Sequence, residues 1–436
     1  MKTFLKWLFG VSCALLVAVA LAVFFVLRAL QPAPGEWTRQ VRIGPFEREL
    51  SMPALLRIAS HPFTLRLMEG RHVHTPYGTV HWQAVNAPNT WRAVCAPCTL
   101  PVGGLGREPL RLSRVEFTVV PDLEMNLQGH FAIGDTSERG LEPLQGRWSS
   151  RIERQQLTLQ FRIADEPAVR AFALFRQDIP EFARARIEGR VSVKAQWRWP
   201  SHEWELKPRL DGLTVSGLGT EALLNAQPAC GSAEATTDFG TWLPRAVIAA
   251  EDQRYFEHPG YDLNEIVAAW FGNQRSGSAV SGGSTLPQQL AKLVYTGDSR
   301  HHGRKLRELL YAVELDRTLG KARLLNLYLA LAPWGDGQCG AQAAARHFFR
   351  KDAAALTPME AVWLASLLHN PDRELAMLGR HGDANRARVT WVADQVRPAT
   401  RREREALVKA AERWRPPAPA LRVAMAVAAS QAEKGR

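Results

Sequence analysis

Leu243-Pro-Arg-Ala-Val-Ile-Ala-Ala-Glu251-Asp-Gln-Arg-Tyr-Phe256-Glu-His258-Pro-Gly260 is the most informative segment of the 436-residue chain. Pro244 suits the first turn of a helix, where its missing N–H costs nothing. At about 100° per residue, Glu251 falls on the apolar face with Val247. Because a carboxylate there is costly to ionise, its pKa should rise toward the range useful for proton transfer. A glutamate near a helix end that reaches solvent would fit the same periodicity.

A second segment, Gly282-Gly283-Ser284-Thr285-Leu-Pro287-Gln288-Gln289-Leu-Ala-Lys292, predicts a flexible turn followed by a capped helix. Ser and Thr favour the N-cap position, and Pro287 falls in the first turn. Helix N-termini attract anions, and Lys292 adds positive charge, so a phosphate group is a natural ligand. The spacing is not that of a P-loop. A purely structural helix cap explains Ser284 and Thr285 equally well.

The third segment is Arg300-His-His-Gly-Arg304-Lys-Leu-Arg307-Glu308-Leu-Leu-Tyr311. If its leucines face the core, then Arg304, Arg307, Glu308 and Tyr311 share the opposite helix face. That face is basic with a single carboxylate. It fits either a solvated surface with an Arg304–Glu308 pair or a wall that holds a pyrophosphate.

Together the three segments resemble glycosyltransferase family 51, the peptidoglycan transglycosylase module of class A penicillin-binding proteins and of monofunctional transglycosylases. The resemblance covers residues 238–372. Glu251-Asp252-x-x-x-Phe256-x-His258-x-Gly260 resembles the first motif of the family. Gly283-Ser-Thr-Leu-x-Gln-Gln-Leu-x-Lys292 resembles the second, and Arg304-Lys-x-x-Glu308 the third.

The resemblance implies a lysozyme-like helical fold and an inverting transfer between lipid-linked sugars. Glu251 would be the general base that deprotonates the acceptor hydroxyl, and Glu308 would lie by the donor diphosphate. The implied diphosphate and substrate ligands are Ser284, Gln288, Gln289, Lys292, Arg300, Arg304 and Arg307, and the implied structural positions are Asp252, Phe256, His258, Gly260, Gly283 and Thr285. The substrates would be lipid II and the lipid-linked growing glycan. No cofactor is tightly bound and no protein metal site is implied, although a divalent cation (Mg²⁺ or Mn²⁺) can accompany the diphosphate.

The sequence departs from the family at two places. Pro287 replaces a Thr or Ser, and Asn326-Leu-Tyr-Leu-Ala330 replaces Glu-x-Tyr-Leu-Asn. No Ser-x-x-Lys with a Lys-Thr-Gly partner is found, so we expect glycan polymerisation without transpeptidase activity. Two alternatives remain open: an inactive cell-envelope scaffold that keeps the fold, and a lysozyme-like enzyme that cleaves glycan.

The N-terminal segment predicts the location of the chain. From Trp7 to Leu27 there is no charged residue, which is long enough to span a bilayer as a helix. Lys2 and Lys6 precede it, and positive flanks stay in the cytoplasm. We therefore expect residues 1–35 to form an uncleaved, single-pass anchor and linker in a bacterial inner membrane. The bulk of the chain would be extracytoplasmic, in the periplasm.

The remaining sequence predicts a multidomain α+β protein. Stretches such as 157–163 and 189–199 alternate apolar and polar residues, as strands with one buried face do. We expect a β-rich, membrane-proximal domain over residues 36–222, with short helices between Glu166 and Ala185. Residues 223–436 should form an all-α glycosyltransferase domain with a helical C-terminal extension. We find no chemical signature beyond Pro371 and none in the β-rich domain, which is a candidate site for a cell-envelope protein partner.

Charge and cysteine content restrict the partners. The net charge of +12 comes from scattered arginines rather than one dense run, which argues against nucleic acid and suits phosphate-bearing lipids. Cys13 lies in the expected anchor. Cys95, Cys98, Cys230 and Cys339 would lie in an oxidising compartment, with pairings that sequence cannot assign. A local disulfide suits Cys95 and Cys98 better than a redox or zinc site.

Three histidines, His72, His74 and His81, invite a metal hypothesis because alternate strand residues share a face. No carboxylate at matching spacing completes the set. Solvated strand histidines are the favoured interpretation.

Overall fold

The computed structural model describes residues 12, 16–17, 20–21, 24–43, 46–100, 109–134, 140–226, 238–276, 283–297, 303–397 and 400–434. The expected anchor at Trp7–Leu27 falls largely outside the described residues, as do Gly282, Arg300 and Cys230. Among the residues described, no helix combines the length and the apolar character needed to cross a bilayer.

The chain forms two compact units. Unit 1 consists of Met1–Pro101, Pro109–Leu174 and Gly189–Asp211, and unit 2 of Val102–Glu108, Phe175–Glu188 and Gly212–Arg436. Residues 175–188 and 212–222, which the sequence pattern assigned to the β-rich domain, therefore group with the helical unit. The predicted order of a β-rich N-terminal region and a helical C-terminal region is confirmed.

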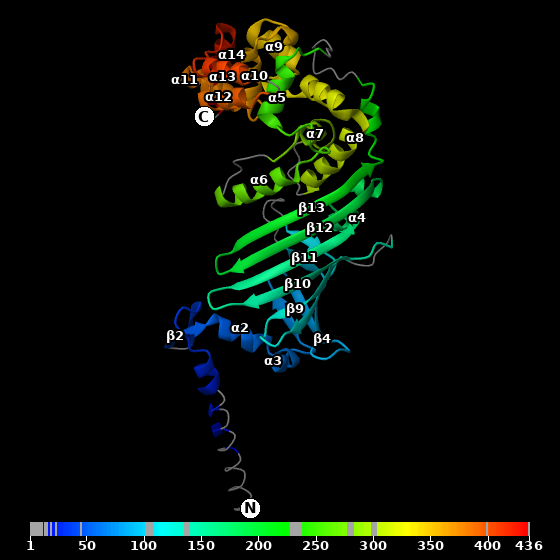
Figure 1. The fold of residues 1–436 in the computed structure, drawn as a ribbon, viewed down its shortest axis with the longest axis vertical. Coiled ribbons are helices and arrows are strands. Elements are labelled where there is room, and N and C mark those ends of the chain that lie inside the picture. Colours follow the sequence, from blue (N-terminus) through cyan, green and yellow to red (C-terminus); the bar gives the residue numbers. More distant parts are fainter. Residues whose placement is uncertain are drawn as a thin grey trace, which may run out of the picture. The chain divides into compact units, whose positions relative to one another are not determined.

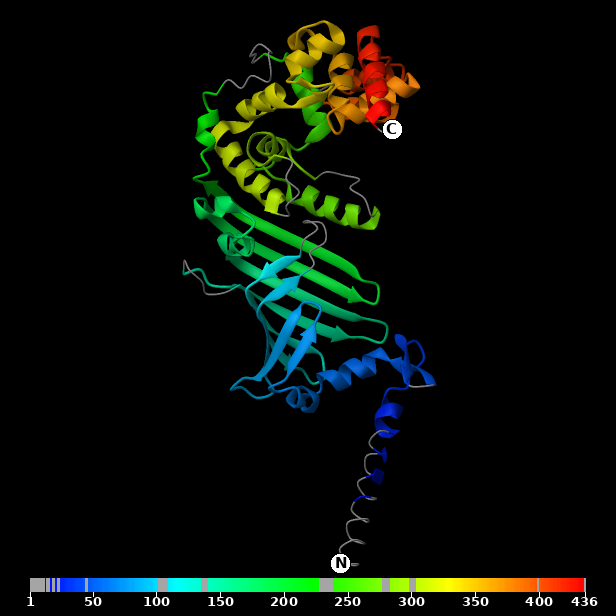
Figure 2. The same ribbon diagram turned by 180° about the vertical axis from the view of Figure 1, so that it is seen from behind.

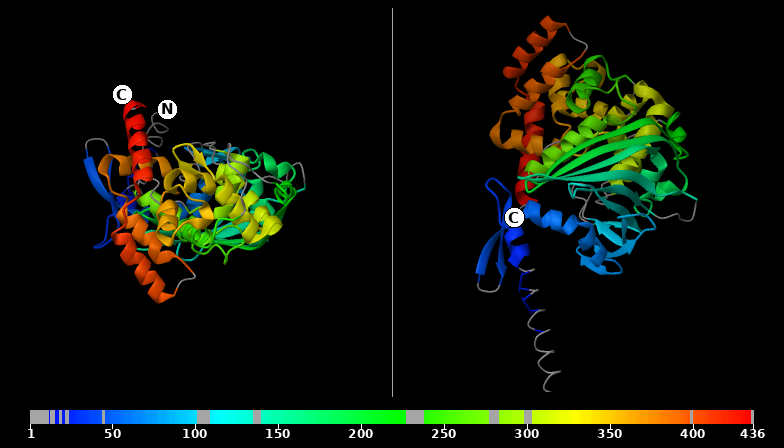
Figure 3. Two further views of the ribbon diagram at one scale, coloured as in Figure 1. Left: turned by 90° about the horizontal axis from the view of Figure 1, so that it is seen from above. Right: turned by 60° about the horizontal axis from the view of Figure 1, so that its bottom comes forward.

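Unit 1 is built on a nine-stranded antiparallel sheet, in the order β13-β12-β11-β10-β9-β8-β5-β4-β3 (Figure 1). Neighbours in the chain are mostly neighbours in the sheet, so short connections suffice. Its strands are β3 (His72–Thr75), β4 (Gly78–Ala84), β5 (Trp91–Cys95), β8 (Val115–Pro121), β9 (Leu127–Ile133), β10 (Leu144–Ile152), β11 (Leu157–Pro167), β12 (Arg186–Trp199) and β13 (Glu203–Ser216). Figure 3 shows its long strands side by side as one curved layer.

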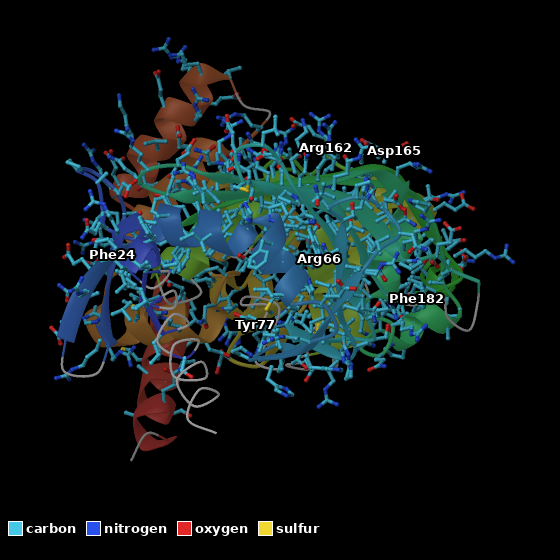
Figure 4. All side chains as sticks on the ribbon, turned by 90° about the horizontal axis from the view of Figure 1, so that it is seen from below. Phe24, Arg66, Tyr77, Arg162, Asp165 and Phe182 are labelled. Carbon is cyan, nitrogen blue, oxygen red and sulfur yellow. A yellow bond between two sulfur atoms is a disulfide. The ribbon has the colours of Figure 1, made fainter. Side chains whose placement is uncertain are left out.

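The register gives this sheet one apolar and one polar face. Trp148 pairs with Phe161, which pairs with Ala195, on the apolar side. One residue along, Arg147 pairs with Arg162 and Arg162 with Lys194, and all three basic side chains are exposed. In Figure 4 the labelled Arg162 lies at the outer boundary of the molecule. The alternation in the sequence thus reflects a sheet with one apolar, partly buried face and one exposed basic face.

Smaller elements complete unit 1. The helices α2 (Met52–Ser60) and α3 (Pro62–Leu67) lie beside one end of the sheet (Figure 2), where Leu65 packs with Trp91 and Val119. Cys95 and Cys98 form the predicted disulfide. The remaining elements are the pairs β1 (Thr38–Ile43) with β2 (Phe46–Ser51) and β6 (Cys98–Leu100) with β7 (Leu110–Leu112), and α4 (Ala168–Ala173).

Unit 2 is mainly helical and packs around fully buried residues such as Tyr255, Leu286, Leu310 and Trp334. Its longest element, α8, is two helices joined at Gly320, whose backbone is not helical. One detail departs from an all-α domain: β14 (Pro333–Gly335) pairs with β15 (Gln338–Cys339). The helices are η1 (Pro180–Ala183), η2 (Thr220–Leu223), α5 (Trp242–Glu251), α6 (Leu263–Ser276), α7 (Leu286–Ala291), η3 (Lys292–Thr296), α8 (Gly303–Leu331), α9 (Ala341–Phe349), η4 (Ala353–Ala355), α10 (Pro358–Ser366), α11 (Pro371–His381), α12 (Arg386–Gln395), α13 (Arg401–Glu412) and α14 (Ala418–Lys434).

Gly260 fixes how the turn after α5 meets α8. Its φ is +83°, and a Cβ added there would lie 2.4 Å from the carbonyl oxygen of Ala312. Both the left-handed backbone and the close approach therefore require glycine. This explains why the first motif ends in Gly260.

We expect Gly260→Ala to lower the free energy of unfolding by about 3 kcal/mol, because backbone strain and overlap with α8 add together. Gly337→Ala is the matched control, since Gly337 also has a positive φ (+69°) but meets no atom within 4 Å. The control should lose only about 1 kcal/mol. Urea unfolding of both variants measures the difference, and equal losses would contradict the steric argument.

Candidate functional site

The carboxylate of Asp252 joins the first two motifs. It follows the last residue of α5 and accepts a hydrogen bond of 2.9 Å from the backbone N–H of Leu286, the first residue of α7. The same carboxylate lies 2.9 Å from Nε2 of His258. Both Asp252 and His258 are buried. The two residues therefore hold the start of α7 against the turn after α5.

A capping box also forms at the N-terminus of α7. The Thr285 hydroxyl accepts from the Gln288 N–H at 3.4 Å, and the Gln288 side chain accepts from the Thr285 N–H at 3.0 Å. The Thr285 hydroxyl also donates to the carbonyl of Gly260 at 2.6 Å. Gln288 is 2% exposed, so its side chain is occupied by the cap. The side chain of Gln289, one residue later, contacts Glu251 instead.

Glu251 is held by two donors. Nε2 of Gln289 donates to one carboxylate oxygen at 3.1 Å, and Nη2 of Arg388 donates to the other at 3.2 Å. The Tyr328 hydroxyl fixes Gln289 by donating to its Oε1 at 2.8 Å. Burial raises the pKa of Glu251, and the hydrogen bond from Gln289 and the charge of Arg388 only partly offset this effect. The raised pKa agrees with the apolar helix face on which the sequence placed this carboxylate.

Arg388 is a functional candidate that sequence reasoning missed. It lies in α12, and its guanidinium also donates to the carbonyl of Ala250 at 3.0 Å and lies 4.8 Å from the ring centre of Trp391. The sequence showed no chemical signature beyond Pro371, and the structure places Arg388 from that region against Glu251. Arg388 is 137 residues from Glu251 in the chain, and no spacing rule connects residues so far apart.

Glu308 lies in the first turns of α8 among cations. Its side chain is 1% exposed and accepts from Nη1 of Arg304 at 2.7 Å and from Nζ of Lys305 at 2.8 Å. Nζ of Lys305 also donates to the Ser284 hydroxyl at 2.5 Å. Lys305 was not among the predicted ligands, although its i,i+3 spacing to Glu308 was a signal available in the sequence.

The segment from Ser284 to Gln289 thus contacts the surroundings of both candidate glutamates. At one end Ser284 meets Lys305, the partner of Glu308, and at the other Gln289 meets Glu251. A base with a raised pKa and a cluster of cations are the two features that an acid–base transfer with an anionic leaving group needs.

The other predicted residues have different surroundings. Arg307 donates to both carboxylate oxygens of Glu181, at 2.6 to 2.9 Å. Phe256 is 70% exposed. Gly283 needs its missing side chain, because a Cβ would lie 2.5 Å from the carbonyl oxygen of Glu265. Lys292 lies at the C-cap of α7.

In the described part of the chain, no group of three His, Cys, Asp or Glu residues is placed so that it could hold a metal ion. His72 and His81 pair across β3 and β4 with ring centres 4.2 Å apart, and Nδ1 of His74 lies 3.0 Å from the Thr79 hydroxyl.

Comparison with known proteins identifies the helical unit. The model of the transglycosylase family matches residues 231–397. A biosynthetic peptidoglycan transglycosylase of Azoarcus sp. is 40% identical over 164 residues, which cover 35% of this chain and 71% of the relative. The chain belongs to the transglycosylase family.

Two further relatives share the name biosynthetic peptidoglycan transglycosylase. The protein of Nitrosomonas europaea is 47% identical and that of Nitrosomonas eutropha 43% identical, each over 129 residues that cover 30% of this chain and 53% of the relative. The chain thus spans about half to seven tenths of the length of these relatives. The transglycosylase match includes Arg388, but it leaves out Glu181 and the whole of the large sheet.

Glu251→Gln should change the pH dependence of stability. An amide resembles the protonated carboxyl, so both proteins should be equally stable below the ordinary pKa of about 4.5. As pH rises through the raised pKa, only the wild type bears the cost of ionising a buried group. It should lose about 1.4 kcal/mol relative to the variant for each unit by which its pKa is raised. Calorimetric Tm values from pH 4 to 9 measure this.

Glu360→Gln is the control of opposite sign. Although burial opposes it, hydrogen bonds from Lys351 and from the Thr357 cap lower the pKa of Glu360. The wild type should therefore be more stable than this variant near neutrality, and the advantage should vanish as pH falls through the lowered pKa. Parallel pH curves for wild type and Glu251→Gln would contradict the assignment of a raised pKa to Glu251.

Proposed function

We propose that this chain is a peptidoglycan glycosyltransferase that polymerises lipid II into glycan strands by inverting transfer, with release of polyprenyl diphosphate. The observation that carries the proposal is the arrangement around Ser284–Gln289: Glu251 with its raised pKa lies at one end, and the Arg304–Lys305–Glu308 cluster at the other. The names of the relatives agree with this activity.

In the proposed reaction, Glu251 takes the proton from the acceptor hydroxyl as that oxygen attacks the anomeric carbon of the donor. The bond to the diphosphate oxygen breaks, and the leaving group departs with the electron pair. Arg388 and Gln289 would keep the carboxylate of Glu251 oriented while its pKa stays raised. A pKa closer to neutrality suits a general base, because the group must both accept and release the proton.

The cations near Glu308 would stabilise the diphosphate. Lys305 is 46% exposed and bridges Ser284 and Glu308, so its charge is accessible to an incoming anion. Preorganised cations at the position where negative charge develops are usually among the largest catalytic contributions. A Mg²⁺ or Mn²⁺ ion would enter with the substrate diphosphate, and we propose no protein-bound cofactor.

We further propose that the protein is anchored in a bacterial inner membrane, with its bulk in the periplasm. The uncharged segment Trp7–Leu27 and the lysines before it support this location. A membrane-bound enzyme meets a lipid-linked substrate where that substrate resides. The polar face of the large sheet is available for a cell-envelope protein partner.

The test is polymerisation of labelled lipid II by the detergent-solubilised full chain. We expect long glycan products from the wild type and at least about a hundredfold loss in Glu251→Gln, because an amide cannot accept the proton. A folded wild type that yields no polymer would favour an inactive scaffold. Shortening of preformed glycan would favour a cleaving enzyme.

Arg388→Gln should shift the acidic limb of the pH profile of kcat/KM to higher pH. The charge of Arg388 lowers the pKa of Glu251, so its removal lets burial raise that pKa further. Arg386→Gln is the matched control on the same helix, since Arg386 is 56% exposed and pairs with Asp383 instead. An unshifted limb in Arg388→Gln would contradict an electrostatic role for this arginine.

A further inference from the structure

A segment outside the transglycosylase match packs against the helix that carries the third motif, Arg304 to Glu308. Residues 175–188 follow α4 in the chain, include the start of β12 and group with unit 2. Their contacts with α8 follow one stripe of that helix: Asp178 meets Gly303, Glu181 meets Arg307, and Arg184 meets Tyr311. We call residues 175–188 the clamp segment.

The contacts of the clamp segment are close and specific. A Cβ on Gly303 would lie 2.4 Å from the carbonyl oxygen of Asp178, so the first residue of α8 has no room for a side chain. Nη2 of Arg184 donates to the Tyr311 hydroxyl at 2.9 Å. Tyr311 in turn stacks on Tyr295, with ring centres 4.1 Å apart and planes at 4°. Tyr295 belongs to η3, directly after α7, so this contact extends to the second motif.

The central contact is an ion pair between buried Glu181 and partly buried Arg307. Glu181 is 4% exposed and accepts two hydrogen bonds from Nε of Arg307, at 2.8 and 2.9 Å, and one of 2.6 Å from Nη2. Burial alone would raise the pKa of Glu181, yet these bonds outweigh it and the pKa is lowered. Glu181 therefore stays ionised and holds the guanidinium in one orientation.

Helical spacing transmits this constraint to the candidate site. Residues 303, 307 and 311 lie four apart and share one stripe of α8, while Arg304 and Glu308 form the adjacent stripe. Fixing the first stripe against the clamp segment fixes the rotation of the helix about its axis. That rotation determines whether Lys305 can reach Ser284 and Glu308 together, as it does here.

We propose that Glu181 is a positioning residue for the transfer reaction, which acts through Arg307 to orient the first turns of α8 and so the cations that bind the donor diphosphate. Arg307 then serves as the anchor of the clamp segment rather than as a direct phosphate ligand. This inference rests on the proposed function for its chemistry. Glu181 lies outside residues 231–397, which the transglycosylase model matches.

Affinity of the full chain for a phosphoglycolipid that mimics the donor, together with KM and kcat for labelled lipid II, tests the proposal. Glu181→Gln should weaken binding of the mimic and raise KM by about tenfold or more, because a small misplacement of positioned charges is costly. kcat should change less. Arg307→Gln should behave like Glu181→Gln, since each leaves one buried partner unpaired.

The double variant Glu181→Gln with Arg307→Gln separates the two roles of Arg307. Two amides can bond to each other, so an anchoring role predicts recovery of affinity to within about threefold of the wild type. If Arg307 bound the diphosphate directly, the double variant would be no better than Arg307→Gln. That result would overturn the proposal.

Glu374→Gln is the control for stability alone. Glu374 is 7% exposed, lies in α11 and pairs with His369 at 3.3 Å. It should lower Tm without changing affinity for the mimic. Equal affinity in Glu181→Gln and Glu374→Gln would also overturn the proposal.

Hydrogen exchange keeps the inference separate from the proposed function. Backbone amides of residues 303–311 should exchange about tenfold faster in Glu181→Gln than in the wild type, and those of α11 should not. Unchanged exchange rates of residues 303–311 in Glu181→Gln would contradict the positioning role of Glu181, whatever activity the enzyme has. A wild type that makes no polymer but shows the expected exchange and binding differences would instead count against the proposed function alone.

Discussion

The buried carboxylate of Asp252 is the contact on which the candidate site depends. It adds to the Thr285 cap of α7 by accepting from the N–H of Leu286, and it binds His258 at the same time. Without it the free N–H of Leu286 would be buried without a partner, at a cost of about 1 to 3 kcal/mol. The start of α7 would then be held less firmly, and the hydrogen bond from Gln289 to Glu251 would weaken. The first motif thus acts by placing the second.

The hydrogen-bond partners of Glu314, Glu308 and Glu251 distinguish a structural glutamate from the two candidate catalytic ones. Glu314, 2% exposed, is satisfied by the N–H groups of Leu218 and Thr220 and by the Thr220 hydroxyl. The two backbone donors are fixed by the fold and cannot be exchanged for a substrate. Glu308 instead is bound by side-chain cations, one of them half exposed. Among the described residues Glu251 is bound by one cation and one amide, and burial leaves its pKa raised.

The sequence predicted features whose causes are local. Alternation in β10 to β12 and the Thr285 cap of α7 depend on residues within a few positions of each other, and both appear in the structure. The apolar helix face, which is also a local feature, was the basis for predicting the raised pKa of Glu251. For the same reason Lys305 was within reach of a spacing argument. Arg307, by contrast, was placed beside Arg304 and Glu308 on helical periodicity, but periodicity does not tell what packs against each stripe.

Arg388 and Glu181 were beyond such reasoning because their partners are far away in the chain. Arg388 meets Glu251 across 137 residues, and Arg307 meets Glu181 across 126. Both are charged residues in helices or turns of otherwise ordinary composition, where a solvated surface is the better expectation. Burial reverses that expectation: an ionised side chain in the interior must be paired, and its partner is fixed by the tertiary fold alone.

The position of the clamp segment in the chain adds a constraint of its own. The segment follows α4 and runs into the start of β12, outside residues 231–397 of the transglycosylase match. Separating Glu181 from Arg307 would leave the buried carboxylate uncompensated. The third motif of the transglycosylase match is thus held by residues that lie outside that match.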